Sequence, residues 1–372
     1  MRNRTDTLVK KENKQLYESV GAIHLHSTFS DGSLPISEIV PIGEQKGLDF
    51  LMFTDHHTLE PKRRGLEGWY DNILVLIGYE INDPDEINHY LAFRLDKEVK
   101  AGISAQEYVK EVKRKGGIGI IAHPAEKRNS IEAYPPYPWT AWDAEGFDGI
   151  EIWNQISEWL EGVTRSNFLW RVWHPLRSIR FPVWEILQRW DKLNKERRVV
   201  GVGGIDVHAY VMKILGFIKF EIYPYKVQFK SIRTHFFTEK SLRNNGDKLS
   251  FKEAEQQVYQ ALSLGRCFVS NYYLGDARGF EFYCEKSGKR YPMGSRINVS
   301  PYAELYVSTP SPGKIRLLCD GKVIRSQKGK DLFIKVEKEG VYRIEVFKRR
   351  KGWIYSNPIV LQKNKDEFSE QW

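Results

Sequence analysis

The chain has little cysteine: only Cys267, Cys284 and Cys319 occur among its 372 residues, and no two of them form a CxxC pair. This odd, scattered set excludes a zinc site built from cysteines and is typical of a protein from a reducing compartment. The sequence also lacks a run of about 18 apolar residues, which argues against a membrane span. Residues 1–19 form a polar extension without the apolar segment of a signal peptide, so we expect a cytoplasmic protein.

Motifs that would supply a protein nucleophile or a nucleotide-binding loop are missing as well. The sequence contains no GxSxG elbow, no Walker A loop and no GxGxxG motif followed by a ribose-binding acid. The sequence therefore favours chemistry that needs no nucleophilic side chain.

Positive charge is concentrated towards one end of the chain. The formal net charge is +9, and residues 311–351 alone hold 13 Lys and Arg against five Asp and Glu. Such a patch could attract nucleic acid or another polyanion. No nucleic-acid-binding motif accompanies it, so we favour a solvated basic face of a small β domain.

Short apolar runs alternate with amphipathic segments over the first 245 residues. The runs lie at 21–27, 50–57, 73–81, 89–93, 117–124, 148–154 and 199–208, and the helix-like segments lie at 33–47, 104–117 and 182–198. Seven strands that alternate with helices predict an α/β fold closed into a (β/α)7 barrel. We expect this barrel over residues 20–270, with a further helix at 253–266 and a tryptophan-rich insertion at about 130–190.

Residues 271–372 follow a different pattern. Alternating runs punctuated by turns, between about 275 and 362, predict a small C-terminal β-rich domain similar to a β-sandwich. The sequence leaves open what this domain does and which oligomeric state the protein adopts.

The stretch HLHSTFSDG at 24–32 places two histidines one residue apart on a predicted strand. Residues i and i+2 of a strand point to the same face, so we expect His24 and His26 to project together. Further histidines and acids stand near the ends of the predicted strands, where a parallel barrel gathers its functional side chains. They are Asp31, His56, Glu80, His89, His123, Asp206 and His208. Imidazole and carboxylate groups bind zinc, manganese and iron, so the pattern predicts a metal site.

Five short motifs carry a family resemblance. HLHSTFSDG, FTDHH, GYE with NHY, IIAHP and GGIDVH occur in this order over residues 20–245 and resemble the motifs of the PHP (polymerase and histidinol phosphatase) superfamily. The resemblance implies a distorted seven-stranded barrel that holds two or three divalent metal ions. The β-rich tail, ending in WIYSNPIVL, is similar to a PHP branch that includes carbaryl-hydrolase-like proteins.

The resemblance also implies a ligand set. One ion would be held by His24, His26, Glu80 and Asp206, a second by Glu80, His89 and His123, and a third by Asp31, His56 and His208. Glu80 would bridge two ions, and Glu80, Asp206 and His208 would act in catalysis.

Two residues of the motifs, Asp55 and His57, are not among the implied metal ligands. Asp55 would support the site without binding an ion, and the role of His57 stays open. His174 and His235 match no motif, so we expect them on the surface or in the core.

Two ions close together can share a hydroxide and bind both the attacking and the leaving oxygen of a phosphate ester. We therefore predict a metal-dependent phosphoesterase that acts on a small phosphorylated substrate, with the metal-bridging hydroxide as nucleophile. Hydrolysis of a carboxyl ester, amide or carbamate is one alternative, and a nucleic-acid-binding nuclease is another. Manganese, iron and zinc all suit mixed histidine and carboxylate ligands, so the metal stays open.

Substrate contacts are expected from loops beyond the strand ends. Lys127 and Arg128 follow the AHP motif and are candidates to bind phosphate, so Arg128→Ala is predicted to raise KM more than tenfold. Residues 139–190 contain eight of the 11 tryptophans. Trp139 and Trp142 are the candidates to stack on an aromatic substrate, while most of the others are expected to pack within a helical elaboration.

Overall fold

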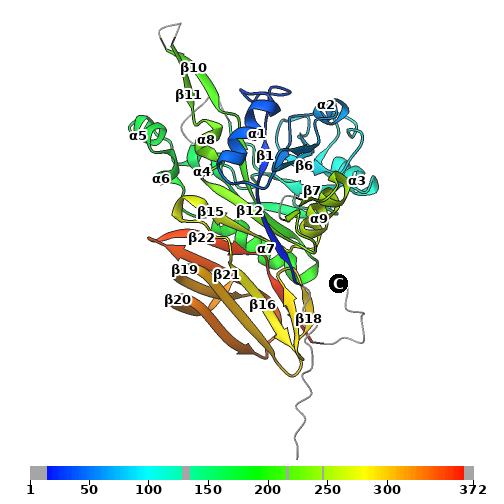
Figure 1. Cartoon of the computed structure of the whole chain (residues 1–372), viewed down its shortest axis with the longest axis vertical. Coiled ribbons are helices and arrows are strands. Elements are labelled where there is room, and N and C mark those ends of the chain that lie inside the picture. Colours follow the sequence, from blue (N-terminus) through cyan, green and yellow to red (C-terminus); the bar gives the residue numbers. More distant parts are fainter. Residues whose placement is uncertain (1–14, 128–134, 215–217, 245–246, 364–372) are drawn as a thin grey trace, which may run out of the picture.

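The computed structural model describes residues 15–127, 135–214, 218–244 and 247–363 (Figure 1). It confirms a mixed α/β fold. Arg128 and part of the predicted tryptophan-rich insertion lie outside the described residues. Within the described ranges, no helix combines the length and the apolar character needed to cross a membrane.

Strands from the first 210 residues pair in a closed ring. They are β1 (Tyr17–Leu25), β2 (Phe50–Phe53), β4 (Ile73–Ile77), β5 (Tyr79–Ile81), β6 (Tyr90–Phe93), β7 (Ile118–Ile121), β8 (Gly149–Asn154) and β9 (Val200–Val207). Parallel pairing joins β1 to β2, β2 to β4, β7 to β8, β8 to β9, and β9 back to β1. β5 follows β4 directly after Gly78, so each predicted apolar run overlaps one strand or, at 73–81, two.

β6 departs from the predicted alternation of strands and helices. It pairs antiparallel with both β5 and β7. Residues 82–89 join β5 to β6 without a helix, and a connection this short reverses the chain, whereas a parallel neighbour needs a crossover of about a dozen residues or more. The strict (β/α)7 pattern is therefore wrong at this strand.

The ring strands are buried on both faces, which explains their nearly continuous apolar sequences. Alternate residues enter two separate clusters: Phe50 and Met52 of β2 lie in one, and Leu51 and Phe53 in the other. A Cβ at Gly21 of β1 would come within 2.3 Å of the Phe50 ring. Glycine is thus required at the point where the Phe50 side chain packs across β1.

Each predicted amphipathic segment overlaps a helix. These helices are α1 (Ile36–Gln45), α3 (Ala105–Arg114), α7 (Trp184–Glu196) and α9 (Phe251–Ser263). α3 begins with a capping box between Ser104 and Glu107 and buries Tyr108, Val109 and Val112, the spacing of one helix face. The shorter helices are α2 (Glu60–Arg63), α4 (Gln155–Glu161), α5 (Phe168–Trp173), α6 (Pro175–Ser178), α8 (Tyr225–Gln228) and the 3₁₀ helix η1 (Tyr272–Leu274).

The remaining strands lie outside the ring: two pairs form separate two-stranded sheets, and the others extend the main sheet. They are β3 (Gly68–Tyr70), β10 (Tyr210–Ile214), β11 (Ile218–Ile222), β12 (Ile232–Thr238), β13 (Arg243–Asn244), β14 (Asp247–Lys248), β15 (Cys267–Asn271), β16 (Glu281–Lys286), β17 (Lys289–Pro292), β18 (Arg296–Asn298), β19 (Ala303–Cys319), β20 (Lys322–Val336), β21 (Gly340–Lys348), β22 (Lys351–Ser356) and β23 (Ile359–Gln362). Antiparallel pairing runs from β1 through β12 and β15 to β22, so hydrogen bonds link the ring to the C-terminal strands.

The C-terminal strands surround their own apolar cluster, which includes Phe282, Leu305 and Ile344. Figure 1 shows these strands gathered at the end of the molecule away from the β10–β11 hairpin. A buried ion pair crosses between the two parts: Arg343 of β21 donates to Asp191 of α7 at 2.7 and 2.9 Å. The boundary at residue 271 stays a prediction, since the sheet is continuous there.

Candidate metal centre

The structure brings all nine predicted ligands into one region. Four overlapping groups of donor atoms each fall within 4.8 Å: His26, Asp31, His56 and His208; His24, His123 and Asp206; His24, His26 and Glu80; and His56, Glu80 and His89. These residues stand at or just beyond the ends of the parallel ring strands. The reversed direction of β6 matters here, because it places the residue before that strand, His89, at the same rim.

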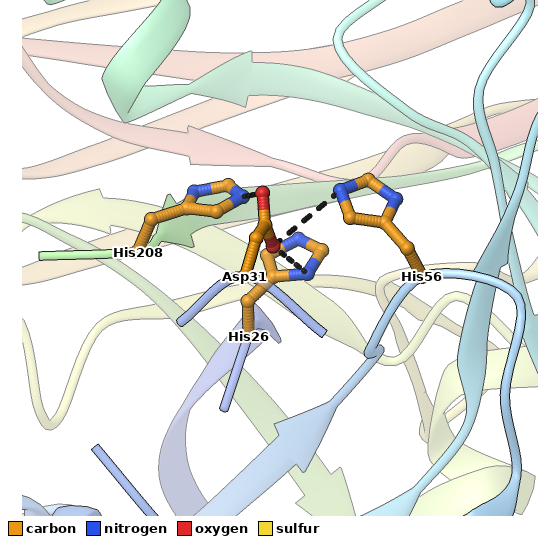
Figure 2. A group of neighbouring side chains, drawn as sticks. All are labelled: His26, Asp31, His56 and His208. Atoms are coloured by element: carbon orange, nitrogen blue, oxygen red, sulfur yellow. Dashed lines mark ion pairs between the residues drawn. The ribbon is translucent and has the colours of Figure 1, made fainter. Parts of the chain in front are cut away.

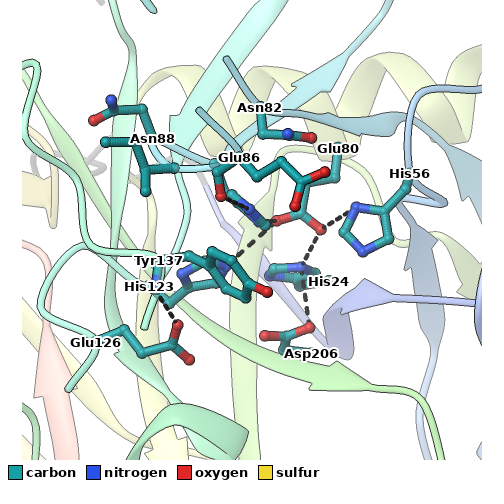
Figure 3. A network of polar contacts seen from close by, with 12 residues as sticks. His24, His56, Glu80, Asn82, Glu86, Asn88, His123, Glu126, Tyr137 and Asp206 are labelled. Carbon is teal, nitrogen blue, oxygen red and sulfur yellow. Dashed lines mark hydrogen bonds and ion pairs between the residues drawn. The ribbon is translucent and has the colours of Figure 1, made fainter. Parts of the chain in front are cut away.

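Glu80 of β5 lies at the centre of this cluster (Figure 3). Its two carboxylate oxygens face different imidazoles. The nitrogens near Oε2 are His24 Nε2 at 3.0 Å, His26 Nε2 at 3.2 Å and His56 Nδ1 at 3.4 Å. The nitrogens near Oε1 are His89 Nδ1 at 2.7 Å and His123 Nε2 at 3.3 Å. A carboxylate in this position can join two cations, one at each oxygen.

Asp31 forms the outer part of the cluster, where its side chain is half exposed (Figure 2). Its Oδ2 lies 3.2 Å from His208 Nε2. Its Oδ1 lies 3.7 Å from His26 Nδ1 and 3.8 Å from His56 Nε2. The three imidazoles converge on one solvent-facing carboxylate, which is the arrangement expected of a third, more open cation position.

Three of the clustered residues have backbone angles that L-residues seldom adopt: φ is 68° at His24, 25° at His123 and 54° at Asp206. His24 also lies where the pairing of β1 shifts register, between Ile23 and Leu25. Bulges and strained residues of this kind re-aim side chains at functional sites. His24 and His26 converge as expected, with ring centroids 5.1 Å apart. However, the bulge directs the two side chains to the same place, whereas the sequence predicted that regular strand alternation would do so.

Sequence reasoning missed Glu151 of β8, a fully buried acid behind the cluster. Glu151 Oε1 lies 2.8 Å from His24 Nδ1, and Oε2 accepts the backbone N–H of His123 at 2.8 Å. A Cβ at Gly204 would come within 1.8 Å of Glu151 Oε1, so the neighbouring glycine makes room for the carboxylate. Glu151 holds the Nδ1 side of His24 and leaves Nε2 directed at Glu80, the usual way in which proteins orient a metal-binding imidazole.

The charges of the cluster favour bound cations. Burial alone would raise the pKa of Glu80 and of Asp206, but the surrounding imidazoles outweigh it and hold both pKa values well below the usual range. Burial would likewise lower the pKa of His26 and of His123, yet the neighbouring carboxylates raise each pKa to about 9. Positive charge is therefore stabilised between these side chains, as protons or as metal ions.

The donor atoms fit a divalent ion. His26 Nε2 is buried, makes no hydrogen bond with the described residues, and faces Glu80 Oε2 at 3.2 Å. Buried polar atoms without partners are costly, and a coordinated ion removes that cost. Imidazole nitrogens mixed with carboxylate oxygens are the donors that manganese, iron and zinc accept.

Asp55 and His57 lie beside the cluster. Asp55 accepts the Ser27 backbone N–H at 2.7 Å and the hydroxyls of Ser27 and Ser30, each at 2.8 Å. These bonds fix the loop between His26 and Asp31, as expected of a residue that supports the site. His57 is exposed and lines the pocket described next.

A pocket of about 310 Å³ opens over the cluster. Besides the predicted ligands, the described residues that line it are His57, Asn82, Glu86, Tyr137 and Tyr210. Two of these stack on ligand imidazoles. The ring centroids of Tyr137 and His89 are 5.0 Å apart, and those of Tyr210 and His208 are 5.3 Å apart. Sequence reasoning missed both tyrosines, because neither belongs to a histidine motif.

The substrate candidates among the described residues do not line this pocket. Trp139 is 2% exposed and packs in the core near Tyr90 and Tyr108, so its ring cannot stack on a ligand in the pocket, and that prediction is wrong. Lys127 is exposed but is not among the residues that line the pocket, and Arg128 lies outside the described residues. Trp142 packs against the Arg189 guanidinium instead of lining the pocket.

Two histidines lie away from the cluster, as the sequence predicts. His174 is exposed beside Trp170. His235 is buried between Glu18, at 2.7 Å from Nδ1, and Ser270, at 2.8 Å from Nε2. Both nitrogens of His235 therefore have partners that make a ligand unnecessary.

Comparisons with known proteins give distant likenesses. No family model matches the chain. A curated uncharacterized protein of Methanocaldococcus jannaschii is 24% identical in an alignment of 115 residues. The match covers 27% of this chain and 66%, just under two thirds, of that protein's length.

Three solved structures resemble the fold weakly. One is a two-domain protein of Bacteroides vulgatus that contains a predicted PHP-like metal-dependent phosphoesterase, with 16% identity, 94% of this chain and 99% of that chain covered, and a TM-score of 0.43. Another is a predicted metal-dependent phosphoesterase of Bifidobacterium adolescentis, with 15% identity, coverages of 65% and 95%, and a TM-score of 0.34. The third is an amidohydrolase of Chromobacterium violaceum with bound sulfate, with 12% identity, coverages of 50% and 87%, and a TM-score of 0.29. TM-scores below 0.5 assign neither fold nor activity, so the metal centre rests on its own geometry.

Proposed function

We propose that this protein is a metal-dependent phosphoesterase that acts on a small phosphorylated substrate. One observation carries the proposal: the buried carboxylate of Glu80 presents one oxygen to His24, His26 and His56 and the other to His89 and His123. The resemblance of the histidine motifs to the PHP superfamily supports the same assignment, with the strand ring as its distorted seven-stranded barrel.

The residues present would hold two or three divalent ions, of manganese, iron or zinc. His24, His26 and Asp206 would complete the position at Glu80 Oε2, His89 and His123 the position at Oε1, and Asp31, His56 and His208 the outer position. When bound, such ions activate water near neutral pH and offset the charge of a phosphate ester.

Other side chains and the backbone orient the ligands and shape the space that a substrate would enter. Glu151 fixes the face that His24 presents to the centre, and the left-handed backbone of His123 and Asp206 directs both side chains inward. Asp31 and His208 lie at the pocket, so the outer cation position borders the space that a substrate would enter. Tyr137 and Tyr210 border the space that a small substrate would occupy.

A second candidate reaction is the hydrolysis of a carboxyl ester, amide or carbamate. It is favoured by the pocket lining, which among the described residues includes Glu86 and no lysine or arginine. A neutral substrate avoids repulsion from Glu86, whereas a phosphate relies on the ions or on Arg128, which lies outside the described residues. We do not favour a nuclease, because the basic residues 311–351 lie on β19–β22 and the turns between them, and none of them lines this pocket.

The test is a substrate panel. Metal-loaded protein is assayed against phosphomonoesters, phosphodiesters and aryl carbamates, with Glu80→Gln as the control for contaminating activity. We expect turnover of a phosphomonoester that the control lacks. Turnover of carbamates alone would overturn the phosphoesterase assignment in favour of the second candidate, and activity retained by Glu80→Gln would exclude both.

A further inference from the structure

A second polar cavity lies on the seam between the ring and the C-terminal strands. Three arginines line it: Arg198, which precedes β9, Arg266, which precedes β15, and Arg296 of β18. The cavity has a volume of about 30 Å³ for the centre of a water molecule, about twice the space that one water needs. No aspartate or glutamate is among the described residues that line it.

The positive charge in this cavity is poorly compensated. Arg266 pairs with Glu239 at 2.9 Å. Among the described residues, Arg198 and Arg296 form no ion pair; each donates one hydrogen bond to a backbone carbonyl, Arg198 to Gly294 at 3.2 Å and Arg296 to Asn194 at 2.5 Å. Most of their N–H groups therefore remain available to a ligand.

The electrostatics support the same view. Burial lowers the pKa of Arg198, and the nearby Arg266 lowers it further. Burial also lowers the pKa of Arg296, with a further contribution from Arg198. Like charges held together in a partly buried place cost free energy that a bound anion would recover.

This cavity is separate from the metal centre. Arg198 stands before the first residue of β9, while Asp206 and His208 stand at its other end. At about 3.3 Å per strand residue, the two ends of that segment are roughly 25 Å apart. Anion binding here would therefore not use the residues proposed for catalysis.

We propose that the cavity formed by Arg198, Arg266 and Arg296 binds a tetrahedral oxyanion, that is, a phosphate or sulfate group. Guanidinium groups match such anions through paired N–H donors, and Arg198 and Arg296, which form no ion pair among the described residues, together carry the charge that balances a dianion. Because the arginines come from both sides of the seam, the bound anion would also hold the C-terminal strands against the ring.

Isothermal titration and thermal unfolding of the full metal-loaded chain test this assignment, with inorganic phosphate, sulfate and a nucleoside monophosphate as probes at constant ionic strength. We expect saturable phosphate binding at a site distinct from the metal centre. Phosphate at ten times its Kd should raise Tm by about 2 °C or more. Equal binding of the nucleoside monophosphate would indicate that a phosphate carried on a larger molecule is also accepted, and its failure to bind would restrict the site to free anions.

Variants separate this site from phosphate bound at the metal centre. Arg198→Gln and Arg296→Gln should each weaken the phosphate site at least tenfold, and Arg296→Lys, which keeps the charge but not the paired donors, should weaken it less. Arg325→Gln, an exposed arginine of β20, is the matched control and should bind as the unsubstituted chain does. Circular dichroism establishes that each variant is folded. Unchanged phosphate binding in folded Arg198→Gln and Arg296→Gln would overturn the proposal, as would an equal effect of chloride.

Discussion

Replacing Glu151 with glutamine keeps the size of a buried side chain and removes one acceptor. Three donors converge on this carboxylate: His24 Nδ1 at 2.8 Å, the His123 backbone N–H at 2.8 Å and Asn154 Nδ2 at 2.9 Å. Glutamine offers a single acceptor oxygen, and its NH₂ group must face one of the three. If it faces His24, Nδ1 becomes an acceptor and the ring proton moves to Nε2, the nitrogen directed at Glu80.

The size of the effect follows from these bonds. Loss of a hydrogen bond to a charged group costs about 1.5–3 kcal/mol of stability, so Glu151→Gln should remain folded but less stable. Replacing the partner that orients a metal-binding histidine typically lowers metal affinity about 10- to 100-fold. We expect a loss in this range for the ion held by His24, and a smaller one for the ion held by His123.

Chelator competition with purified protein measures these affinities, and circular dichroism measures the folded fraction. Asp191→Asn is the matched control, since it also removes the charge of a buried acid that pairs with Arg343 far from the cluster. The control should lose stability without a change in metal affinity per folded molecule. If folded Glu151→Gln binds metal as tightly as the unsubstituted chain, Glu151 does not orient the cluster and the reasoning is refuted.

Three further changes have expected outcomes. Gly204→Ala should displace the Glu151 carboxylate, because the new Cβ would lie 1.8 Å from Oε1, and chelator competition should again show weaker metal binding; unchanged binding would contradict this contact. Burial raises the pKa of Glu158 to about 7, above its unfolded value, so its contribution to stability is present at low pH and is lost as pH rises towards 7. Urea unfolding measures the free energy of unfolding of both proteins. Between pH 5 and pH 8, this free energy should fall by about 2 kcal/mol more in the unsubstituted chain than in Glu158→Gln. If the difference between the two proteins did not change with pH, the prediction would be contradicted. Tyr210→Ala, which opens the pocket wall at His208, should raise KM at least severalfold with unchanged metal content in elemental analysis, and an unaltered KM would place the substrate elsewhere.

The sequence predicts the ring strands because their signal is local. Both faces of β2 and β4 are buried, and runs such as FLMF and ILVLI record that burial directly. The direction of a strand leaves no such trace. The antiparallel course of β6 depends on the short connection at 82–89, which apolar periodicity does not report.

The site residues divide in the same way. The histidines and acids of the short motifs were predicted because unlike donors recur at strand ends. Glu151 was missed although it carries a comparable signal: like Glu80, it is an acid inside an apolar strand, between the buried Ile150 and Ile152. A charge enclosed by apolar neighbours needs a partner, and that argument could have found it.

The environment of Trp139 could not be predicted from the loop that contains it. The sequence made Trp139 a candidate to stack on a substrate, but the space beside Tyr90 and Tyr108 accepts its ring, and burying a large ring is favourable. Which cavity a tryptophan fills depends on residues distant in sequence, so composition alone does not decide it.

The metal content of Glu80→Gln tests the central claim most directly. Elemental analysis of the purified unsubstituted chain should find two or three transition-metal ions per chain. Folded Glu80→Gln should carry at least one fewer ion and lose most hydrolytic activity, because the substitution removes the charge that both cation positions share. His174→Ala, outside the cluster, should change neither. Full metal content and turnover in Glu80→Gln would contradict the shared carboxylate, and with it the metal centre proposed here.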